Sequence, residues 1–331
     1  MQQKILITRS IFPDVIERLR QYFDVTVNEG ARYSPQSLRE ALRDKDGVLV
    51  TGGEKFDADT VDGLAQLRAV CISAAGYNSI DVQALTRAGV IVANAPGPAD
   101  ETTADFAWAL MLATARRLAE AAHWVQDGNW KGSAGSRFFG TDVHGRVLGI
   151  IGMGRIGQAI ARRAAGFRMQ VLYHNRHRLA APIEQDCKAV YATKEDLLRQ
   201  SDFVILSLPY TPDNRHLIAG KELQLMRRSA MLFNIARGGL IDESALAEAL
   251  REHRIAAAGL DVFEAEPVID PGLTGLPNVI LTPHIAGGTE ATQHGLASLA
   301  ADNLIAALGQ GPNAGHPPSI LNPEVLASRN H

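Results

Sequence analysis

Short apolar runs alternate with longer amphipathic segments along the chain. In the first hundred residues, four runs of four or five residues are separated by polar-faced stretches long enough to form helices. Runs of this length predict buried strands, and their alternation with helices is typical of a parallel sheet covered on both faces. The predicted strands are ILIT (5–8), GVLV (47–50), AVCIS (69–73) and VIVAN (90–94).

A second series of apolar runs follows a long helical segment. One helix is expected from about Glu101 to Asp127, and a connector rich in Gly, Ser and aromatic residues follows it. Six strands, mostly with helical segments between them, then match a full doubly wound domain. They are predicted at 147–152, 170–174, 203–208, 230–236, 258–262 and 279–282, and a helix from about 289 to 308 comes after them.

Composition and charge narrow the classes of function. A chain of 331 residues with 46% hydrophobic and 21% charged residues suits two globular domains. Its 33 basic and 36 acidic residues leave a net charge of −3, which argues against a nucleic-acid binder. The longest uncharged apolar stretch, 106–115, is too short to span a membrane. With no signal-peptide pattern, and only two cysteines without metal-ligand spacing, we expect a cytoplasmic protein without a metal site.

A glycine-rich motif, Gly-Met-Gly-Arg-Ile-Gly, lies between a predicted strand and a predicted helix. The glycines allow a tight turn, close approach of the backbone to a pyrophosphate and close packing of the helix on the strand. The helix N-terminus adds partial positive charge. The context therefore predicts a dinucleotide site at Gly152, Gly154, Arg155, Ile156 and Gly157.

The residues after the second strand of this domain indicate which dinucleotide binds. An NAD site usually has Asp or Glu there to bind the ribose hydroxyls, but this chain reads His174-Asn175-Arg176. Arg176 can pair with a 2′-phosphate, and Asn175 can donate to the same group. We therefore expect NADP(H) to be preferred, with NAD(H) possible, and we place His174 at the edge of the cofactor.

Three ionisable residues follow apolar strands in the second half of the chain, where open α/β sheets bind ligands. Arg237 follows AMLFNIA, Glu266 lies in DVFEAEP and His284 follows VILTP. Each has a structural alternative: an arginine at a strand end, a glutamate in a turn, or a histidine at a helix entrance. The residues alone do not decide between these alternatives.

At this point the sequence resembles the D-isomer-specific 2-hydroxyacid dehydrogenases. The segments LGIIGMGRIGQAIARR, NIARGGLIDESAL, AAAGLDVFEAEP and TPHIAGGT match that family's signatures in the right order, and the resemblance covers essentially the whole chain. It implies an α/β protein of two doubly wound parallel-sheet domains. A Rossmann cofactor domain at 100–288 would be inserted in a flavodoxin-like substrate domain made of 1–99 and 289–331.

The resemblance also implies that Arg237, Glu266 and His284 are catalytic. Arg237 would bind the substrate carboxylate and polarise the carbonyl, since its planar fork of donors suits this geometry. His284 would donate the proton to the carbonyl oxygen, and Glu266 would orient the imidazole and favour its charged form. Reduction should then persist to higher pH than a free imidazole allows. The backbone of Ala75 and Gly76 would hold the carboxylate from the other domain, across a cleft that closes on the ligands.

Further cofactor contacts are implied by the same resemblance. Asp261 would contact the nicotinamide amide, with Ala236 and Thr103 nearby, and Pro209 would border the adenine. One departure is His-Ile-Ala-Gly-Gly-Thr where many members read His-Ile-Gly-Ser-Ala-Thr, so we expect a slightly different backbone beside the nicotinamide. Within the family, the chain looks most like NADPH-preferring reductases of glyoxylate, hydroxypyruvate and 2-ketogluconate. The expected ligands are small 2-keto and 2-hydroxy acids.

The same resemblance leaves other functions open for this chain and implies an assembly state. Some relatives are corepressors that sense dinucleotides, and others are NAD-dependent dehydrogenases of different substrate range. Formate dehydrogenases are a further alternative, but they have glutamine where this chain has Glu266. The helix at 101–127 and the aromatic connector, with Trp130, Phe138 and Phe139, resemble the family's dimerisation region. We therefore expect a homodimer.

Overall fold

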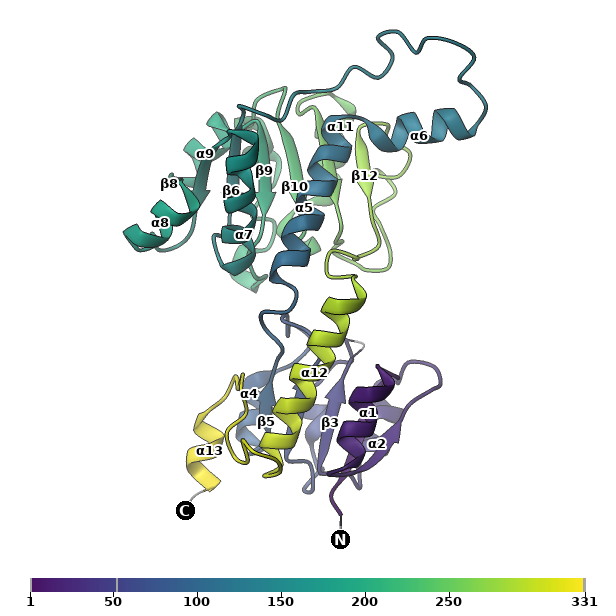
Figure 1. The fold of residues 1–331 in the computed structure, drawn as a ribbon, viewed down its shortest axis with the longest axis vertical. Helices are drawn as coiled ribbons and strands as arrows, with labels where there is room; N and C mark the ends of the chain where they lie inside the picture. The colour runs from purple at the N-terminus through teal and green to yellow at the C-terminus, as the bar shows by residue number, and fades with distance from the viewer. Residues whose placement is uncertain (1, 52, 330–331) are drawn as a thin grey trace. The chain divides into compact units, whose positions relative to one another are not determined.

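The chain forms two compact units in the computed structural model, which describes residues 2–51 and 53–329. Unit 1 comprises Met1–Ala99 and Gly288–His331, and unit 2 comprises Asp100–Gly287. The chain therefore leaves unit 1 once and returns to it (Figure 1). Within the described residues, no helix combines the length and the apolar character needed to cross a membrane.

Unit 1 contains a five-stranded parallel sheet in the order β2-β1-β3-β4-β5, which is the flavodoxin-like order. Alternate residues of each strand face opposite sides: Ile5 and Ile7 pack with α1 and α12, and Leu6 packs with α2. The strands are β1 (Lys4–Ile7), β2 (Asp24–Val27), β3 (Gly47–Val50), β4 (Ala69–Ile72) and β5 (Ile91–Ala93). The helices are α1 (Pro13–Arg20), α2 (Pro35–Leu42), α3 (Ala58–Val61), α4 (Val82–Arg87), α12 (Glu290–Ala307) and α13 (Glu324–Arg329).

Unit 2 contains a seven-stranded parallel sheet in the order β12-β11-β10-β9-β6-β7-β8. The strand order runs outward from β6 in both directions, so the topological switch point lies between β6 and β9. Ligands of open α/β sheets bind at the carboxyl ends of the strands around such a point. The strands are β6 (Val147–Ile151), β7 (Gln170–His174), β8 (Ala189–Tyr191), β9 (Phe203–Leu206), β10 (Met231–Asn234), β11 (Ala257–Leu260) and β12 (Val279–Leu281).

Helices cover both faces of the second sheet. One apolar core is formed with residues of α5 (Asp100–Ala115), α7 (Arg155–Ala164) and α8 (Ala181–Cys187). The other is formed with residues of α9 (Lys194–Gln200), α10 (Gly220–Leu225) and α11 (Glu243–Arg251). The remaining helical segments are α6 (Leu118–Gln126) and the 3₁₀ turns η1 (Ala165–Phe167), η2 (Pro212–Asn214) and η3 (Gly238–Leu240). Together the two sheets confirm the predicted fold class.

The elements differ from the sequence-based expectations in three places. Strands β2 and β8 were not predicted, and both are edge strands of three or four residues. Polar and apolar residues alternate in β2, and β8 has only three residues, so neither gives a long apolar run. The single helix expected from Glu101 to Asp127 was wrong, because it is divided into α5 and α6. Arg117 adopts a left-handed conformation with φ of 54° and ends the first helical segment.

Candidate active site

The glycine-rich loop connects β6 to α7. Gly152 has a φ of 100°, and a Cβ atom there would lie 2.3 Å from the carbonyl oxygen of Ser207. A Cβ on Gly157 would lie 2.3 Å from the carbonyl oxygen of Gly152, whereas nothing lies within 4 Å of a Cβ placed on Gly154. The loop is therefore tightly packed at Gly152 and Gly157 and open at Gly154, where α7 begins with the partial positive charge that favours a phosphate.

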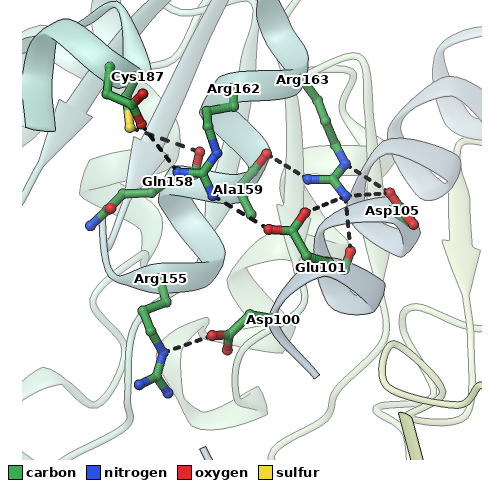
Figure 2. Close-up of polar contacts among 10 residues, drawn as sticks. Asp100, Glu101, Asp105, Arg155, Gln158, Ala159, Arg162, Arg163 and Cys187 are labelled. Carbon is green, nitrogen blue, oxygen red and sulfur yellow. Dashed lines mark hydrogen bonds and ion pairs between the residues drawn. The ribbon is translucent and has the colours of Figure 1, made fainter. Parts of the chain in front are cut away.

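Ion pairs attach α7 to α5 on the surface of unit 2 (Figure 2). The side chain of Arg155 donates from Nε to Asp100 Oδ2 at 2.7 Å. Further along α7, Arg163 lies 2.8 Å from Glu101 and 2.7 Å from Asp105. The side chain of Arg155 is thus directed to Asp100. At the predicted phosphate site, we expect this residue to contribute its backbone at the start of α7 and not its side chain.

The end of β7 supports the glycine-rich loop directly. Asn175 accepts a hydrogen bond from the backbone N–H of Met153 at 2.7 Å, and the backbone N–H of Gly152 donates to the carbonyl of His174 at 3.0 Å. The ring of His174 is held by the carbonyl of Ala192, 3.0 Å from Nδ1. Because Oδ1 of Asn175 already accepts from Met153, the side chain would contact a ligand through its NH₂ group. An NH₂ group is a hydrogen-bond donor and is therefore suited to phosphate.

Two arginines follow Asn175, and they differ in their surroundings. Arg178 makes a bidentate pair with Glu184, with Nε and Nη2 each 2.9 Å from a carboxylate oxygen. This pairing lowers the pKa of Glu184 to about 2. Arg176 is exposed and forms no ion pair with any described acidic residue. Of the two, Arg176 is the cation that a ligand phosphate can engage.

Arg237 lies in the turn after β10, and Asn234 shapes this turn. The side chain of Asn234 accepts from the N–H of Ala236 at 3.0 Å and donates to the carbonyl of Arg237 at 2.8 Å. The guanidinium donates to the carbonyl of Ala236 at 2.6 Å. Burial lowers the pKa of Arg237, and the nearby carboxylate of Glu266 opposes that effect. A half-buried guanidinium with a planar fork of donors is suited to holding a carboxylate.

Glu266 and His284 form the central hydrogen-bonded pair. Glu266 Oε2 lies 2.8 Å from His284 Nδ1, and Glu266 Oε1 accepts from the backbone N–H of Phe263 at 2.9 Å. Since Nδ1 is bonded to the carboxylate, Nε2 is the ring atom left to exchange a proton with a substrate. His284 has a φ of 55°, which is uncommon for a residue with a side chain.

Asp261 holds the backbone that carries His284. Its carboxylate is fully buried and accepts hydrogen bonds from Ile285 N–H at 2.9 Å, Ala286 N–H at 2.8 Å and Thr282 Oγ1 at 2.7 Å. The N–H of His284 donates to the carbonyl of Asp261 at 2.9 Å. These bonds stabilise the left-handed conformation of His284. The predicted contact between Asp261 and the nicotinamide stays a prediction.

The other predicted residues occupy the following positions. Thr103 is buried in the first turn of α5, and the carbonyl of Pro209 accepts from Asn214 at 2.9 Å. In unit 1, Ala75 and Gly76 lie in the loop after β4, where the carbonyl of Ala75 accepts from Asn94 at 2.7 Å. Their roles in binding stay predictions.

Sequence reasoning missed the residues that support the site. Asn234 could have been found, because an Asn two residues before an Ala-Arg turn is a common Asx signal. Thr282, whose hydroxyl binds Asp261, carries no such signal, since its partner is 21 residues away. No group of three or more His, Cys, Asp or Glu side chains suited to a metal ion occurs among the described residues.

Comparisons with known proteins give a consistent result. The model of the D-isomer specific 2-hydroxyacid dehydrogenase, NAD binding domain, matches residues 108–286. The chain is 44% identical to a glyoxylate reductase of Thermococcus kodakarensis, over 99% of both chains. It is 43% identical to a glyoxylate/hydroxypyruvate reductase B of Pectobacterium atrosepticum, over 98% of this chain and 100% of that protein. The NADPH-dependent glyoxylate/hydroxypyruvate reductase of Sinorhizobium meliloti, solved with NADP and malonate, aligns with a TM-score of 0.87 and 31% identity over 98% of each chain.

Proposed function

The chain belongs to the D-isomer-specific 2-hydroxyacid dehydrogenases, an NAD(P)-binding oxidoreductase family, and we propose that it reduces a small 2-keto acid to the D-2-hydroxy acid with NADPH. The expected substrates are glyoxylate, hydroxypyruvate or 2-ketogluconate. The observation that carries this proposal is the 2.8 Å pair of Glu266 and His284, with Arg237 close enough to Glu266 for the two charges to interact. A proton donor and a carboxylate-binding cation are the two groups that keto-acid reduction requires from the protein.

His284 is the proposed proton donor. In the imidazolium form of His284, Nδ1–H donates a hydrogen bond to Glu266. The proton on Nε2 is transferred to the carbonyl oxygen of the substrate as negative charge develops there. NADPH, when bound, would supply the hydride to the carbonyl carbon. In the opposite direction His284 would take the proton back from the hydroxyl group. Glu266 thereby selects the tautomer and stabilises the charged ring.

Arg237 is the proposed anchor of the substrate carboxylate. The guanidinium donates to the carbonyl of Ala236, which orients its plane. A bidentate contact from the guanidinium would fix the keto acid in one orientation. The backbone N–H groups of Ala75 and Gly76 are also proposed to bind the substrate.

The cofactor preference rests on the end of β7. A dinucleotide fits the glycine-rich loop, because Gly154 leaves the start of α7 open. The residues proposed to hold the 2′-phosphate are Arg176 and Asn175, and Asp or Glu is absent from both positions. The NADP complex of the Sinorhizobium meliloti relative agrees with this choice. A cytoplasmic location is part of the same proposal.

A homodimer is proposed from α6 and the connector after it, which lie away from the sheet of unit 2 (Figure 1). No residue of α6 is buried, although it carries several apolar side chains. Trp130 is 64% exposed and Phe139 74% exposed. A cavity of about 790 Å³ lies between this segment and the β10–β12 part of unit 2. Exposed apolar surface of this kind favours association with a second copy.

Light scattering tests this interface. The wild type should have the mass of a dimer, and the double variant Trp130→Glu/Phe139→Glu should have the mass of a monomer. An unchanged mass in the variant would contradict this interface.

A steady-state comparison of glyoxylate, hydroxypyruvate, pyruvate and 2-ketogluconate, each with NADPH and NADH, tests the proposed reaction. We expect turnover with at least one of the three named substrates and a higher kcat/KM with NADPH. Binding of NADPH without turnover on the whole panel would favour a dinucleotide-sensing binding protein. Higher kcat/KM with NADH would favour an NAD-dependent dehydrogenase of different substrate range.

A further inference from the structure

The loop that carries Glu266 is attached to the first turn of α11. Glu243, the first residue of that helix, accepts a hydrogen bond from the backbone N–H of Glu264 at 2.6 Å. Glu243 therefore holds the loop at a position two residues before Glu266.

The carboxylate of Glu243 is buried, with 8% of the residue exposed. Burying a carboxylate is unfavourable unless hydrogen bonds replace the water it loses. Here the replacement comes from the backbone N–H of Glu264 and from the N-terminal end of α11, where negative charge is favoured. Because the N–H of Glu264 belongs to the loop backbone, the carboxylate and the loop conformation depend on each other.

A second attachment holds the same loop from the outside. The side chain of Glu264 accepts from Arg215 Nε at 2.9 Å and lies 3.0 Å from His216 Nε2. These two residues follow η2, so the pairs join a separate segment of the chain to the loop. They are more exposed than Glu243, and a surface ion pair contributes less than a buried hydrogen bond.

The loop backbone is also packed against the turn of Arg237. A Cβ atom on Gly238 would lie 1.8 Å from the carbonyl carbon of Phe263 and 2.2 Å from the nitrogen of Glu264. The peptide bound by Glu243 thus lies directly against the residue after Arg237. A shift of this peptide would affect both Glu266 and the turn that presents Arg237.

We propose that Glu243 is a positioning residue for the reduction: its carboxylate fixes the 263–270 loop so that Glu266 holds His284 in its hydrogen-bonded orientation. This proposal rests on the proposed function, since it assigns Glu243 a part in the same proton transfer. Glu243 touches neither substrate nor cofactor in this account. It acts through the backbone of Glu264.

The test compares Glu243→Ala with Glu248→Ala, a matched change at an exposed glutamate of the same helix. Displacement of a catalytic group by about 1 Å can reduce the rate by about 100-fold, so we expect kcat for the substrate that the panel identifies to fall by about 10- to 100-fold in Glu243→Ala. The KM for NADPH should stay unchanged, because the glycine-rich loop is not altered. Glu248→Ala should behave as the wild type.

A double-mutant cycle with Glu266→Gln separates positioning from a general structural role. If Glu243 acts through Glu266, adding Glu243→Ala to Glu266→Gln should lower kcat no further. An equal fold-loss in both backgrounds, or equal kcat for Glu243→Ala and Glu248→Ala, would overturn the proposal. If Glu243→Ala does not fold, Glu243→Gln takes its place in the cycle. The amide of Glu243→Gln retains one acceptor oxygen, so we expect this variant to lose less kcat than Glu243→Ala would. A wild-type kcat in Glu243→Gln would overturn the proposal. Failure of the proposed function would be seen separately, as wild-type protein without turnover or as Glu266→Gln with wild-type kcat.

Discussion

Unit 2 contains two sets of acidic residues that have different kinds of partners. Asp100, Glu101 and Asp105 on α5 pair with arginine side chains of α7 at the surface (Figure 2). Asp261 and Glu243, near the carboxyl end of the sheet, accept hydrogen bonds from backbone N–H groups of the loops that carry His284 and Glu266. The second set fixes the conformation of the proposed catalytic loops, whereas the first set attaches one helix to another.

The kind of partner determines how much the loss of an acidic residue affects the protein. An exposed arginine can find water or another carboxylate when its partner is removed, so the loss is small. A buried backbone N–H that loses its acceptor has no such replacement, and the loop must move to satisfy it. The two sets therefore predict effects of different size on stability and on activity.

Asp261→Ala should give the largest effect of the two sets. It removes the acceptor of three hydrogen bonds, so we expect the free energy of unfolding to fall by about 3–5 kcal/mol and kcat to fall with it. Urea unfolding and steady-state kinetics would measure both. A loss of less than about 1 kcal/mol, as expected of a surface pair, would show that the buried carboxylate is not the main support of the His284 loop.

Glu266→Gln should have the next largest effect, and on activity rather than stability. The amide still occupies the site but no longer favours the charged imidazole, so kcat for the substrate that the panel identifies should fall by about 10-fold or more. Steady-state kinetics measure this loss, and a wild-type kcat in Glu266→Gln would contradict the role of Glu266.

Arg176→Ala and Arg178→Ala form a matched pair at the cofactor site. Loss of a charge-assisted contact to phosphate corresponds to about 1.4 kcal/mol, so the KM for NADPH should rise about 10-fold in Arg176→Ala, with the KM for NADH unchanged. Arg178 is already paired with Glu184, and its variant should keep the wild-type KM. Equal KM changes in the two variants would remove the reason for choosing Arg176.

Glu101→Gln combined with Asp105→Asn should have the smallest effect. These side chains are 65% and 71% exposed, so the change in the free energy of unfolding should be below about 1 kcal/mol, with kcat unchanged. Thermal unfolding and kinetics would measure this. A loss as large as that of Asp261→Ala would show that the surface pairs are as important as the backbone acceptors.

The parts of the molecule predicted from sequence are those with local signals. The glycine-rich loop was recognisable because Gly152, Gly154 and Gly157 lie between a strand and a helix. The fold class followed from the alternation of apolar runs. Strand β2 was missed because its polar and apolar residues alternate, and β8 because it has only three residues. The break at Arg117 has no Gly or Pro to indicate it. The role of Glu243 depends on Glu264, 21 residues away, and such a contact leaves no pattern in a single sequence.

In the proposed function, His284 donates the proton in an NADPH-dependent reduction. The most direct measurement is kcat for the wild type and for His284→Ala with NADPH and the substrate of highest kcat/KM in the panel. We predict turnover by the wild type and a loss of about 100- to 10,000-fold in the variant, the range expected for removal of a general acid. Equal kcat values for the two proteins would contradict the assignment of His284 and the account built on it.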